Sequence, residues 1–456
     1  MRADGLRCSC TTYAGAAVGG LAMAERQRVL VKSFGCSSNL ADAEFMRGSL
    51  VKAGFELVEK AVDADVLIYN TCAVKSPTEN RAIEELKDAA KWKEKKLLVT
   101  GCLPLINFER LKSQVRFDGV LGPASSAKIV DAVQSVLLGE KVQWLSRNVR
   151  VKPRLDLPKQ STNPMVSIVP VAYGCLGSCS YCCVVYARGR LCSCGIEEIS
   201  QRVRSDLAAG AKEVWLTGQD MACYGRDIGV NLTDLLKTIC SLEGEFFIRV
   251  GMMTPNCVLD LLDQLVDAFR DPHVFKFLHL PVQSGDNEVL KRMNRFYSID
   301  NFRRIVDAFR KAIPDLTLAT DVICGFPTEN EEAFKRTLTL IEEVKPDVVN
   351  ISKFFPRPRT LAEKMTPKVA ASDVKERSQR LAKLVRRISA EKNAAWMNWA
   401  GKILVDERGK QPGSWIGRNF AYKPIVVKSE DESLVGEFVD VRVVKTFQTY
   451  LEAVIV

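Results

Sequence analysis

The stretch GCLGSCSYCC, residues 174–183, carries four cysteines, and three of them have the spacing C-x3-C-x2-C. These three are Cys175, Cys179 and Cys182. Three thiolates on one loop suit three irons of a [4Fe–4S] cluster, and they leave the fourth iron open for a ligand that is to react. A structural zinc site is the alternative. Its fourth ligand would be one of three other thiols: Cys183, Cys192 or Cys194.

The cysteine and histidine content bears on this choice. The chain has 456 residues and 15 cysteines, so it is too long for a small disulfide scaffold. Zinc sites usually pair their ligands two and two and often include histidine, but this chain has only His273 and His279. We therefore favour the cluster over zinc, and we expect the clustered thiols to work in a reducing cytoplasm.

Composition and charge limit the class of protein. A hydrophobic content of 47% and a charged content of 26% are ordinary for a soluble globular protein, and the absence of a long apolar run predicts no transmembrane helix. The net charge of +10 favours a polyanionic partner. The excess is uneven, because residues 359–392 hold ten Lys and Arg against four Asp and Glu, and residues 147–159 are also basic.

Residues 1–26 differ in composition from the rest of the chain. The run AGAAVGGLAMA lacks the bulky apolar residues of a signal peptide, and Met23 begins a plausible alternative start. We expect a disordered or misannotated extension, and we assign no role to residues 1–22.

Three domains follow from the periodicity. In residues 27–148, the short β-branched runs RVLVKS, DVLIYN and KLLVT alternate with helical stretches, which predicts an α/β domain with a Rossmann-like parallel sheet. Each run leads directly into a cysteine, namely Cys36, Cys72 or Cys102. Because the carboxyl ends of parallel strands share one edge of a sheet, these three cysteines should meet there.

The other two domains differ in type. Residues 149–394 contain six further βα units, typical of a partial (β/α)6 barrel with its chemistry at the carboxyl ends of the strands. They end in a basic helix near 373–392, which could contact phosphates or could be an ordinary solvated face. Residues 395–456 contain KILVDERG, AYKPIVVKS, EFVDVRVVKTF and YLEAVIV, which predict a small all-β barrel.

The cysteine loop resembles that of the radical S-adenosylmethionine (SAM) superfamily, in which an aromatic residue, here Tyr181, precedes the last cysteine. LTGQD (Leu216–Asp220) looks like the element that binds the methionine part of SAM, and TDVICGFPTENEEAF resembles the motif that backs the adenine. HLPVQSGD ends the fourth strand of the barrel. The resemblance implies these SAM-binding residues: Tyr181, Gly218, Gln219, Asp220, Gln283 and Gly325.

SFGCSSNLADAE, YNTCAVKSPTENRA and VTGCLP resemble the amino-terminal domain of the radical-SAM methylthiotransferases. The resemblance implies a second [4Fe–4S] cluster on Cys36, Cys72 and Cys102. The carboxyl-terminal segment is similar to the family's TRAM domain, a small RNA-binding barrel. The motifs GCLGSCSYC, ARGRL and TGQDMACYGRDIGVNL are most similar to the archaeal and eukaryotic branch, which acts on threonylcarbamoyladenosine in tRNA.

The resemblance implies an enzyme that methylthiolates carbon 2 of threonylcarbamoyladenosine beside the anticodon. SAM on the first cluster would supply the radical, the second cluster would supply sulfur, and a second SAM would supply the methyl group. No catalytic residue is expected beyond the cluster ligands. The expected partners are the tRNA anticodon stem-loop, an electron donor and a sulfur source, with no membrane.

Two other kinds of function remain open on the sequence alone. Related methylthiotransferases act on a ribosomal-protein aspartate or on isopentenyladenosine in tRNA. A non-catalytic RNA-binding protein that uses zinc or iron–sulfur groups to keep its shape is a different class. Cleavage of SAM by the reduced protein would distinguish an enzyme from the last of these.

Overall fold

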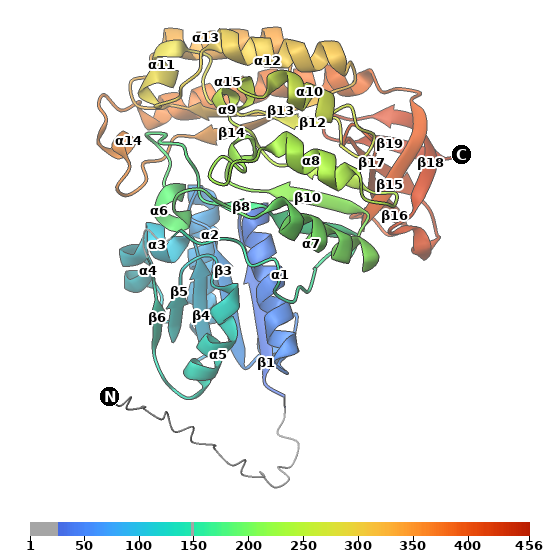
Figure 1. The fold of residues 1–456 in the computed structure, drawn as a ribbon. Coiled ribbons are helices and arrows are strands. Elements are labelled where there is room, and N and C mark those ends of the chain that lie inside the picture. Colours follow the sequence, from blue (N-terminus) through green and yellow to red (C-terminus); the bar gives the residue numbers. More distant parts are fainter. Residues whose placement is uncertain (1–25, 147–149) are drawn as a thin grey trace, which may run out of the picture.

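The computed structural model describes residues 26–146 and 150–456, so the predicted extension, apart from its last residue, lies outside the described part of the chain. Figure 1 shows three bodies: an amino-terminal domain in blue, a partial barrel from green to orange, and a small red barrel beside it. Within the described residues, no helix is long and apolar enough to cross a membrane.

The amino-terminal domain is a six-stranded sheet in the order β2-β1-β3-β4-β5-β6, in which all neighbours pair in parallel. Its strands are β1 (Arg28–Ser33), β2 (Glu56–Leu57), β3 (Val66–Thr71), β4 (Lys96–Gly101), β5 (Gly119–Leu121) and β6 (Val142–Trp144). One face packs on α1 (Ser37–Lys52) and α5 (Ile129–Leu137), and the other on α2 (Ser76–Ala89) and α4 (Phe108–Gln114). The Rossmann-like prediction is confirmed.

The second body is the predicted partial barrel. Two parallel sheets, β11-β10-β7 and β12-β13-β14, are joined by a bridge between Ile248 and Val274. The strands are β7 (Val166–Pro170), β10 (Glu213–Thr217), β11 (Phe247–Val250), β12 (Phe277–His279), β13 (Thr317–Cys324) and β14 (Val348–Lys353). The outer helices include α7 (Ile196–Ala208), α8 (Leu232–Cys240), α10 (Leu262–Ala268), α12 (Ile299–Ala312) and α13 (Glu331–Val344).

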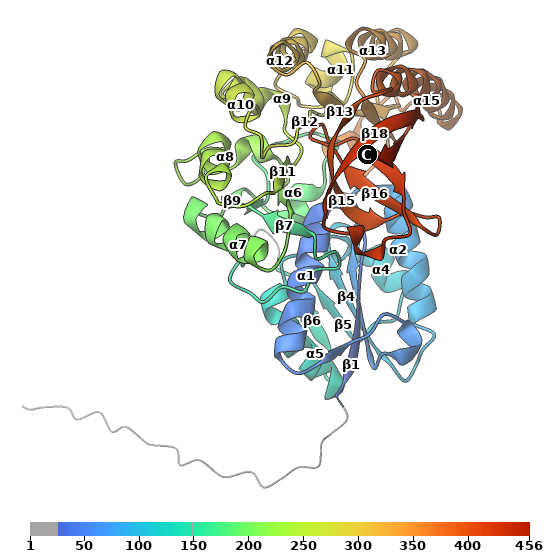
Figure 2. The ribbon, with the colours of Figure 1, turned by 90° about the vertical axis from the view of Figure 1, so that its right-hand side faces the viewer.

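The two flanking domains cover the concave side of this barrel, as Figure 2 shows for the red strands. Val214 and Leu216 belong to the core under the outer helices. Trp215 lies between them in sequence, so it points to the other face, where it packs near Ala41 of α1. On the same side, the ring of Tyr422 lies 5.0 Å from that of Phe277 in β12. The flanking domains thus narrow the space that faces the strand ends.

The carboxyl-terminal body is a closed barrel, β15-β16-β17-β19-β18, preceded by α15 (Ala371–Ala394). Its strands are β15 (Ala400–Arg408), β16 (Ser414–Arg418), β17 (Pro424–Lys428), β18 (Phe438–Thr446) and β19 (Leu451–Ile455). The short strand β16, which contains Gly417, is not predicted from the sequence. A Cβ on Gly417 would lie 2.8 Å from the carbonyl oxygen of Leu404, so this strand needs a glycine for close pairing.

Two buried acids meet where the small barrel packs on the partial barrel. Glu213 of β10 is fully buried and Asp406 of β15 nearly so, and one carboxylate oxygen of each has no hydrogen-bond partner among the described residues. Burial, together with the negative charge of Asp406, raises the pKa of Glu213 to about 7. Burial raises the pKa of Asp406 to about 6. Ionising both acids at this seam is therefore unfavourable.

We expect Glu213→Gln to raise the free energy of unfolding at pH 8 and to leave it nearly unchanged at pH 5. A carboxyl whose folded pKa is raised stabilises the fold below its unfolded pKa, and that contribution is lost as the pH rises through about 7. The gain at pH 8 should be about 2 kcal/mol, measured by urea unfolding. Glu245→Gln, at a largely exposed pair with Lys402, is the matched control and should change little. Equal pH profiles of wild type and Glu213→Gln would contradict this account.

Candidate active site

The C-x3-C-x2-C loop begins directly after β8 (Ala172–Tyr173), at the carboxyl end of the first barrel strand. Gly174 starts the loop with a φ of 76°, and a Cβ there would lie 2.2 Å from the carbonyl oxygen of Arg190. Only glycine fits this close backbone approach. The loop then enters α6 (Val184–Arg188), which lies at the junction of the blue and green bodies in Figure 1.

The three sulfurs of this loop each lie near an N–H group. Each sulfur accepts an N–H group: Gly177 N to Cys175 (3.1 Å), Arg295 Nη1 to Cys179 (3.4 Å) and Val184 N to Cys182 (3.5 Å). A Cβ on Gly177 would lie 3.2 Å from Cys175 Sγ and 3.8 Å from Cys179 Sγ, so glycine keeps the space between them clear. Burial raises the pKa of Cys175 to about 12, and a bound metal would have to displace its proton.

The second triad lies at the carboxyl ends of β1, β3 and β4, as predicted. Cys36 is the first residue before α1, Cys72 follows β3, and Cys102 precedes the short helix α3 (Leu103–Ile106). A Cβ on Gly35 would lie 2.9 Å from Cys72 Sγ, which brings the turn at Cys36 against Cys72. Burial, together with negative charge on the other two cysteines, raises the pKa of Cys102 to about 12. The structure therefore gathers this triad.

Arg188 connects the two triads. It ends the helix that follows the first cysteine loop, and its side chain is buried beside the second triad. Burial raises the pKa of Cys72 and of Cys102, and the charge of Arg188 offsets part of that rise. Its Nη2 donates to Asn39 Oδ1 and to Asp42 Oδ2, both at 2.7 Å. Its Nη1 has no partner in the described structure. A buried cation with a spare N–H group fits an anionic metal–sulfur group at this triad.

The geometry also bears on the zinc alternative. Zinc holds its sulfur ligands about 3.8 Å from one another. Among the described residues, two groups of three metal-ligating side chains lie within 4.8 Å of one another, and neither contains a cysteine of the two triads. The candidate fourth ligands lie elsewhere: Cys183 contacts Ala73 O (3.9 Å), Cys194 contacts Pro153 O (3.5 Å), and Cys192 lies in β9 (Cys192–Ser193). Among the described residues, none of these three thiols forms a close metal-ligand group with the cysteines of the loop.

The TGQD segment lies where the two cysteine sites meet. Thr217 Oγ1 is 2.7 Å from Ser37 Oγ, and Gln219 Nε2 donates to Ser38 Oγ at 3.2 Å, so residues next to Cys36 touch this segment. Gln219 Oε1 is buried without a partner in the described structure. An unpartnered buried acceptor at this position fits a ligand with N–H or O–H groups.

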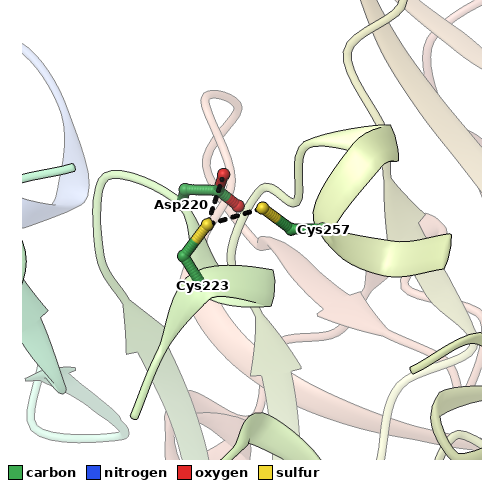
Figure 3. Close-up of side chains that lie close together, drawn as sticks. All are labelled: Asp220, Cys223 and Cys257. Carbon is green, nitrogen blue, oxygen red and sulfur yellow. Dashed lines mark hydrogen bonds between the residues drawn. The ribbon is translucent and has the colours of Figure 1, made fainter. Parts of the chain in front are cut away.

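Asp220, Cys223 and Cys257 form a buried group, the first two just after β10 and the third after β11 (Figure 3). Asp220 Oδ1 accepts from the backbone N–H groups of Ala222 (3.2 Å) and Thr254 (3.0 Å). Its Oδ2 accepts from the thiol of Cys223 at 3.2 Å. These bonds fix the carboxylate at the carboxyl ends of β10 and β11, next to the first cysteine loop.

The remaining predicted SAM residues differ in what surrounds them. Tyr181 packs edge-on against Phe326, with ring centroids 6.4 Å apart, so it touches the fifth-strand motif. Gln283 has a φ of 67°, which is rare outside glycine and is typical of functional sites. A Cβ on Gly218 would lie 3.4 Å from the sulfur of Met221, which is an ordinary contact distance. At Gly325 a Cβ would lie 2.3 Å from Val374 of α15, so helix packing explains this glycine.

Two functional candidates are not predicted from the sequence. Arg188 stands in the ARGRL motif, to which no role was assigned, and Arg295, which donates to Cys179, stands outside every motif. Neither position has a local sequence signal, because each acquires its role by folding against a distant segment. ARGRL, at the end of the cysteine loop, is the one hint.

Comparisons with known proteins agree with this architecture. Three family models match in order: "Uncharacterized protein family UPF0004" at residues 28–122, "Radical SAM superfamily" at 169–341 and "TRAM domain" at 402–456. A solved structure of TsrM from Kitasatospora setae, a radical SAM methyltransferase with cobalamin and a [4Fe–4S] cluster bound, has a TM-score of 0.55 at 12% identity. That similarity covers 90% of this chain and 84% of TsrM, and it supports the fold alone.

Sequence relatives are closer. A Pyrococcus horikoshii protein named "Probable threonylcarbamoyladenosine tRNA methylthiotransferase" is 43% identical over 93% of this chain and 98% of its own length. The Drosophila melanogaster threonylcarbamoyladenosine tRNA methylthiotransferase is 36% identical over 91% of this chain and 75% of its own length. The Homo sapiens protein of the same name is 33% identical over 93% and 73%, respectively.

We expect Arg188→Met to lower the free energy of unfolding by about 3–5 kcal/mol, because it leaves the buried carboxylate of Asp42 without its cation. The double variant Arg188→Met with Asp42→Leu should recover more than half of that loss. Urea unfolding is the measurement. Arg154→Met, at the exposed pair with Asp156, is the matched control and should cost less than about 1 kcal/mol. Equal losses of unfolding free energy for Arg188→Met and Arg154→Met would show that the ion pair between Arg188 and Asp42 does not hold the domains together.

Proposed function

The chain belongs to the threonylcarbamoyladenosine tRNA methylthiotransferase family, and we propose here how its residues perform that reaction. It is a radical SAM enzyme that adds a methylthio group to carbon 2 of threonylcarbamoyladenosine in tRNA, using SAM and two [4Fe–4S] clusters. The observation that carries the assignment of residues is that the triad of the amino-terminal domain packs against the strand ends of the barrel, where Ser37, next to Cys36, contacts Thr217.

We assign one cluster to Cys175, Cys179 and Cys182. The N–H groups aimed at their sulfurs support this assignment, since such bonds stabilise thiolate ligands. The second cluster is assigned to Cys36, Cys72 and Cys102. Arg188 Nη1, which has no partner among the described residues, supports this second assignment, because a buried donor is stabilised by an anionic acceptor. Three ligands each leave one iron open on each cluster.

When bound, SAM and the first cluster supply the one-electron chemistry that breaks the adenine C–H bond, and the second cluster supplies the sulfur. The chain's own residues bind and orient. Gln219 Oε1 and Asp220 offer acceptors to the polar methionine end of SAM, and Tyr181 lines the loop side. We propose that Gln283 and the backbone of Gly325 face the adenine, while Val374 occupies the side of Gly325 where a Cβ would stand. On the concave face, His279 Nε2 is hydrogen-bonded to Asp321 Oδ2 at 2.6 Å, and this pair is available to the modified base.

We propose that the small barrel contributes more of the RNA-binding surface than α15 does. Three arginines of α15 are engaged by acids in or beside α13: Arg377 with Glu329, Arg380 with Glu331, and Arg387 with Glu342. Exposed Lys375, Lys383 and Arg386 remain for phosphates. On the barrel, the rings of Phe447 and Tyr450 stack at 4.5 Å beside the exposed Lys445, a combination that suits unpaired bases and phosphates.

The remaining partners follow from the reaction. An electron donor must reduce the first cluster, and a sulfur source must restore what the second cluster gives up. The cytoplasm is the proposed location, since the substrate is tRNA and the described cysteines are free thiols.

Anaerobically reconstituted protein should hold about eight irons, four per triad. Replacing Cys175, Cys179 and Cys182 by Ala should roughly halve the iron content and abolish SAM cleavage. Replacing Cys36, Cys72 and Cys102 by Ala should also halve it but leave deoxyadenosine release intact. Iron analysis and chromatography of the products are the measurements. The control Cys192→Ala with Cys240→Ala should keep all the iron, and zinc bound at either triad would refute the assignment.

The substrate is tested with two anticodon stem-loops, with and without the threonylcarbamoyl group, given SAM, sulfide and a reductant. The first alone should gain the methylthio mass, because polar groups built to pair with threonylcarbamoyl stay unpaired without it. Such sites discriminate by about four orders of magnitude. Equal turnover of both, or turnover of an isopentenyladenosine stem-loop or a ribosomal-protein peptide, would point to another branch. RNA binding without SAM cleavage would point to the non-catalytic alternative.

A further inference from the structure

Two thiols beside the proposed SAM site are closer together than packing alone requires. Cys223 lies in the turn Met221–Cys223 after β10, and Cys257 lies in α9 (Pro255–Leu259) after the neighbouring strand β11. Their sulfurs are 2.7 Å apart, with Asp220 Oδ2 3.2 Å from Cys223 Sγ (Figure 3). The exposed fractions are 1% for Cys223 and 5% for Cys257, so Cys257 is the more accessible sulfur of a largely buried pair.

The distance decides between two kinds of site. Two cysteines that bind the same zinc ion hold their sulfurs about 3.8 Å apart, which is wider than this pair. A disulfide requires about 2.05 Å, so the sulfurs need to approach by less than about 1 Å. The turn and α9 follow adjacent parallel strands, which fixes their separation and favours this short closure.

We infer that Cys223 and Cys257 are a dithiol–disulfide pair, oxidised by a low-molecular-weight disulfide, and that the oxidation state of the pair sets the hydrogen bonding of Asp220. The formation of the disulfide rests on the geometry of the pair. Its effect on SAM rests on the proposed function, which places SAM at Asp220.

The hydrogen bonds provide the proton route. Cys223 donates its single proton to Asp220, so Cys257 is the donor between the two sulfurs. Cys257, the more exposed of the two thiols, displaces one thiolate from the small disulfide and forms a mixed disulfide. The close contact with Cys257, together with burial, raises the pKa of Cys223, so Asp220 must accept its proton as Cys223 attacks Cys257 and displaces the second thiolate. The two protein protons end on the two released thiols, and the protein loses two electrons to the oxidant.

Closing the disulfide removes the S–H donor from Asp220 Oδ2 and draws the turn that Asp220 caps toward α9. The carboxylate keeps only its bonds from Ala222 N and Thr254 N, both to Oδ1. Losing one orienting hydrogen bond at a ligand-binding carboxylate should weaken SAM binding by about two- to tenfold.

The test equilibrates the holoprotein anaerobically in buffers of 2-mercaptoethanol and 2-hydroxyethyl disulfide, followed by acid quenching, thiol blocking, digestion and mass spectrometry. We expect a linked peptide pair containing Cys223 and Cys257, lighter than the two thiol peptides by two hydrogens. Cys223→Ser and Cys257→Ser should each abolish it, and the control Cys240→Ser should retain it. Separate blocking of both thiols in the most oxidising buffer, persistent mixed disulfides, or zinc bound to the pair would overturn the inference.

Equilibrium dialysis with labelled SAM compares the two forms at equal iron content. The expected result is weaker binding to the disulfide form, which recovers after reduction. A disulfide with unchanged SAM affinity would overturn the link to Asp220. Absence of SAM binding in both forms would instead count against the proposed function, because the linked peptide is detected without SAM.

Discussion

The guanidinium of Arg188 is buried between two domains that each carry a cysteine triad, and most of the site's geometry depends on how its charge is balanced. Asp42 of α1 provides the countercharge, and the hydroxyl of Tyr173 donates to the same carboxylate. Because an unbalanced buried charge is costly, Arg188 and Asp42 can stay buried only while the domains remain together. The bridge begins at the end of the first cysteine loop and ends beside the second triad, so it sets their mutual orientation.

The two triads reach this bridge by the same topological route. In both domains the chain leaves the carboxyl end of a parallel strand and turns sharply, and the cysteine stands in or just after that turn. Gly35 and Gly174 have positive φ and leave no room for a Cβ at these turns. Each triad therefore lies on one sheet edge, and packing those edges together brings Ser37 against Thr217. The reaction needs this proximity, since sulfur must reach a carbon activated at the other cluster.

Sequence patterns were sufficient for the features that repeat along the chain. Alternating apolar strands and helices predicted both α/β domains and placed all six cysteines at strand ends. Sequence patterns did not identify residues whose role depends on a partner that is far away in the sequence. The basic helix allows two interpretations, phosphate contacts or an ordinary solvated face, and neither anticipates that acids in or beside α13 engage Arg377, Arg380 and Arg387. The pairing of Cys223 with Cys257 has no local sequence signal, because 34 positions of sequence separate two sulfurs that the adjacent strands bring together.

The docking of the small barrel constrains how RNA can enter. Lys423 pairs with the buried Asp347, and Tyr422 packs on Phe275 with ring centroids 4.8 Å apart, so the barrel is held by charge and by aromatic contact. A rigid barrel fixes the distance between any nucleotide it binds and the strand ends that carry the cysteines. Electrostatic attraction alone would admit many RNAs. The fixed distance from the small barrel to the strand ends limits which nucleotides can reach the site. Polar contacts with the modified base on the concave face would then select one adenosine in an RNA that is otherwise held by its phosphates.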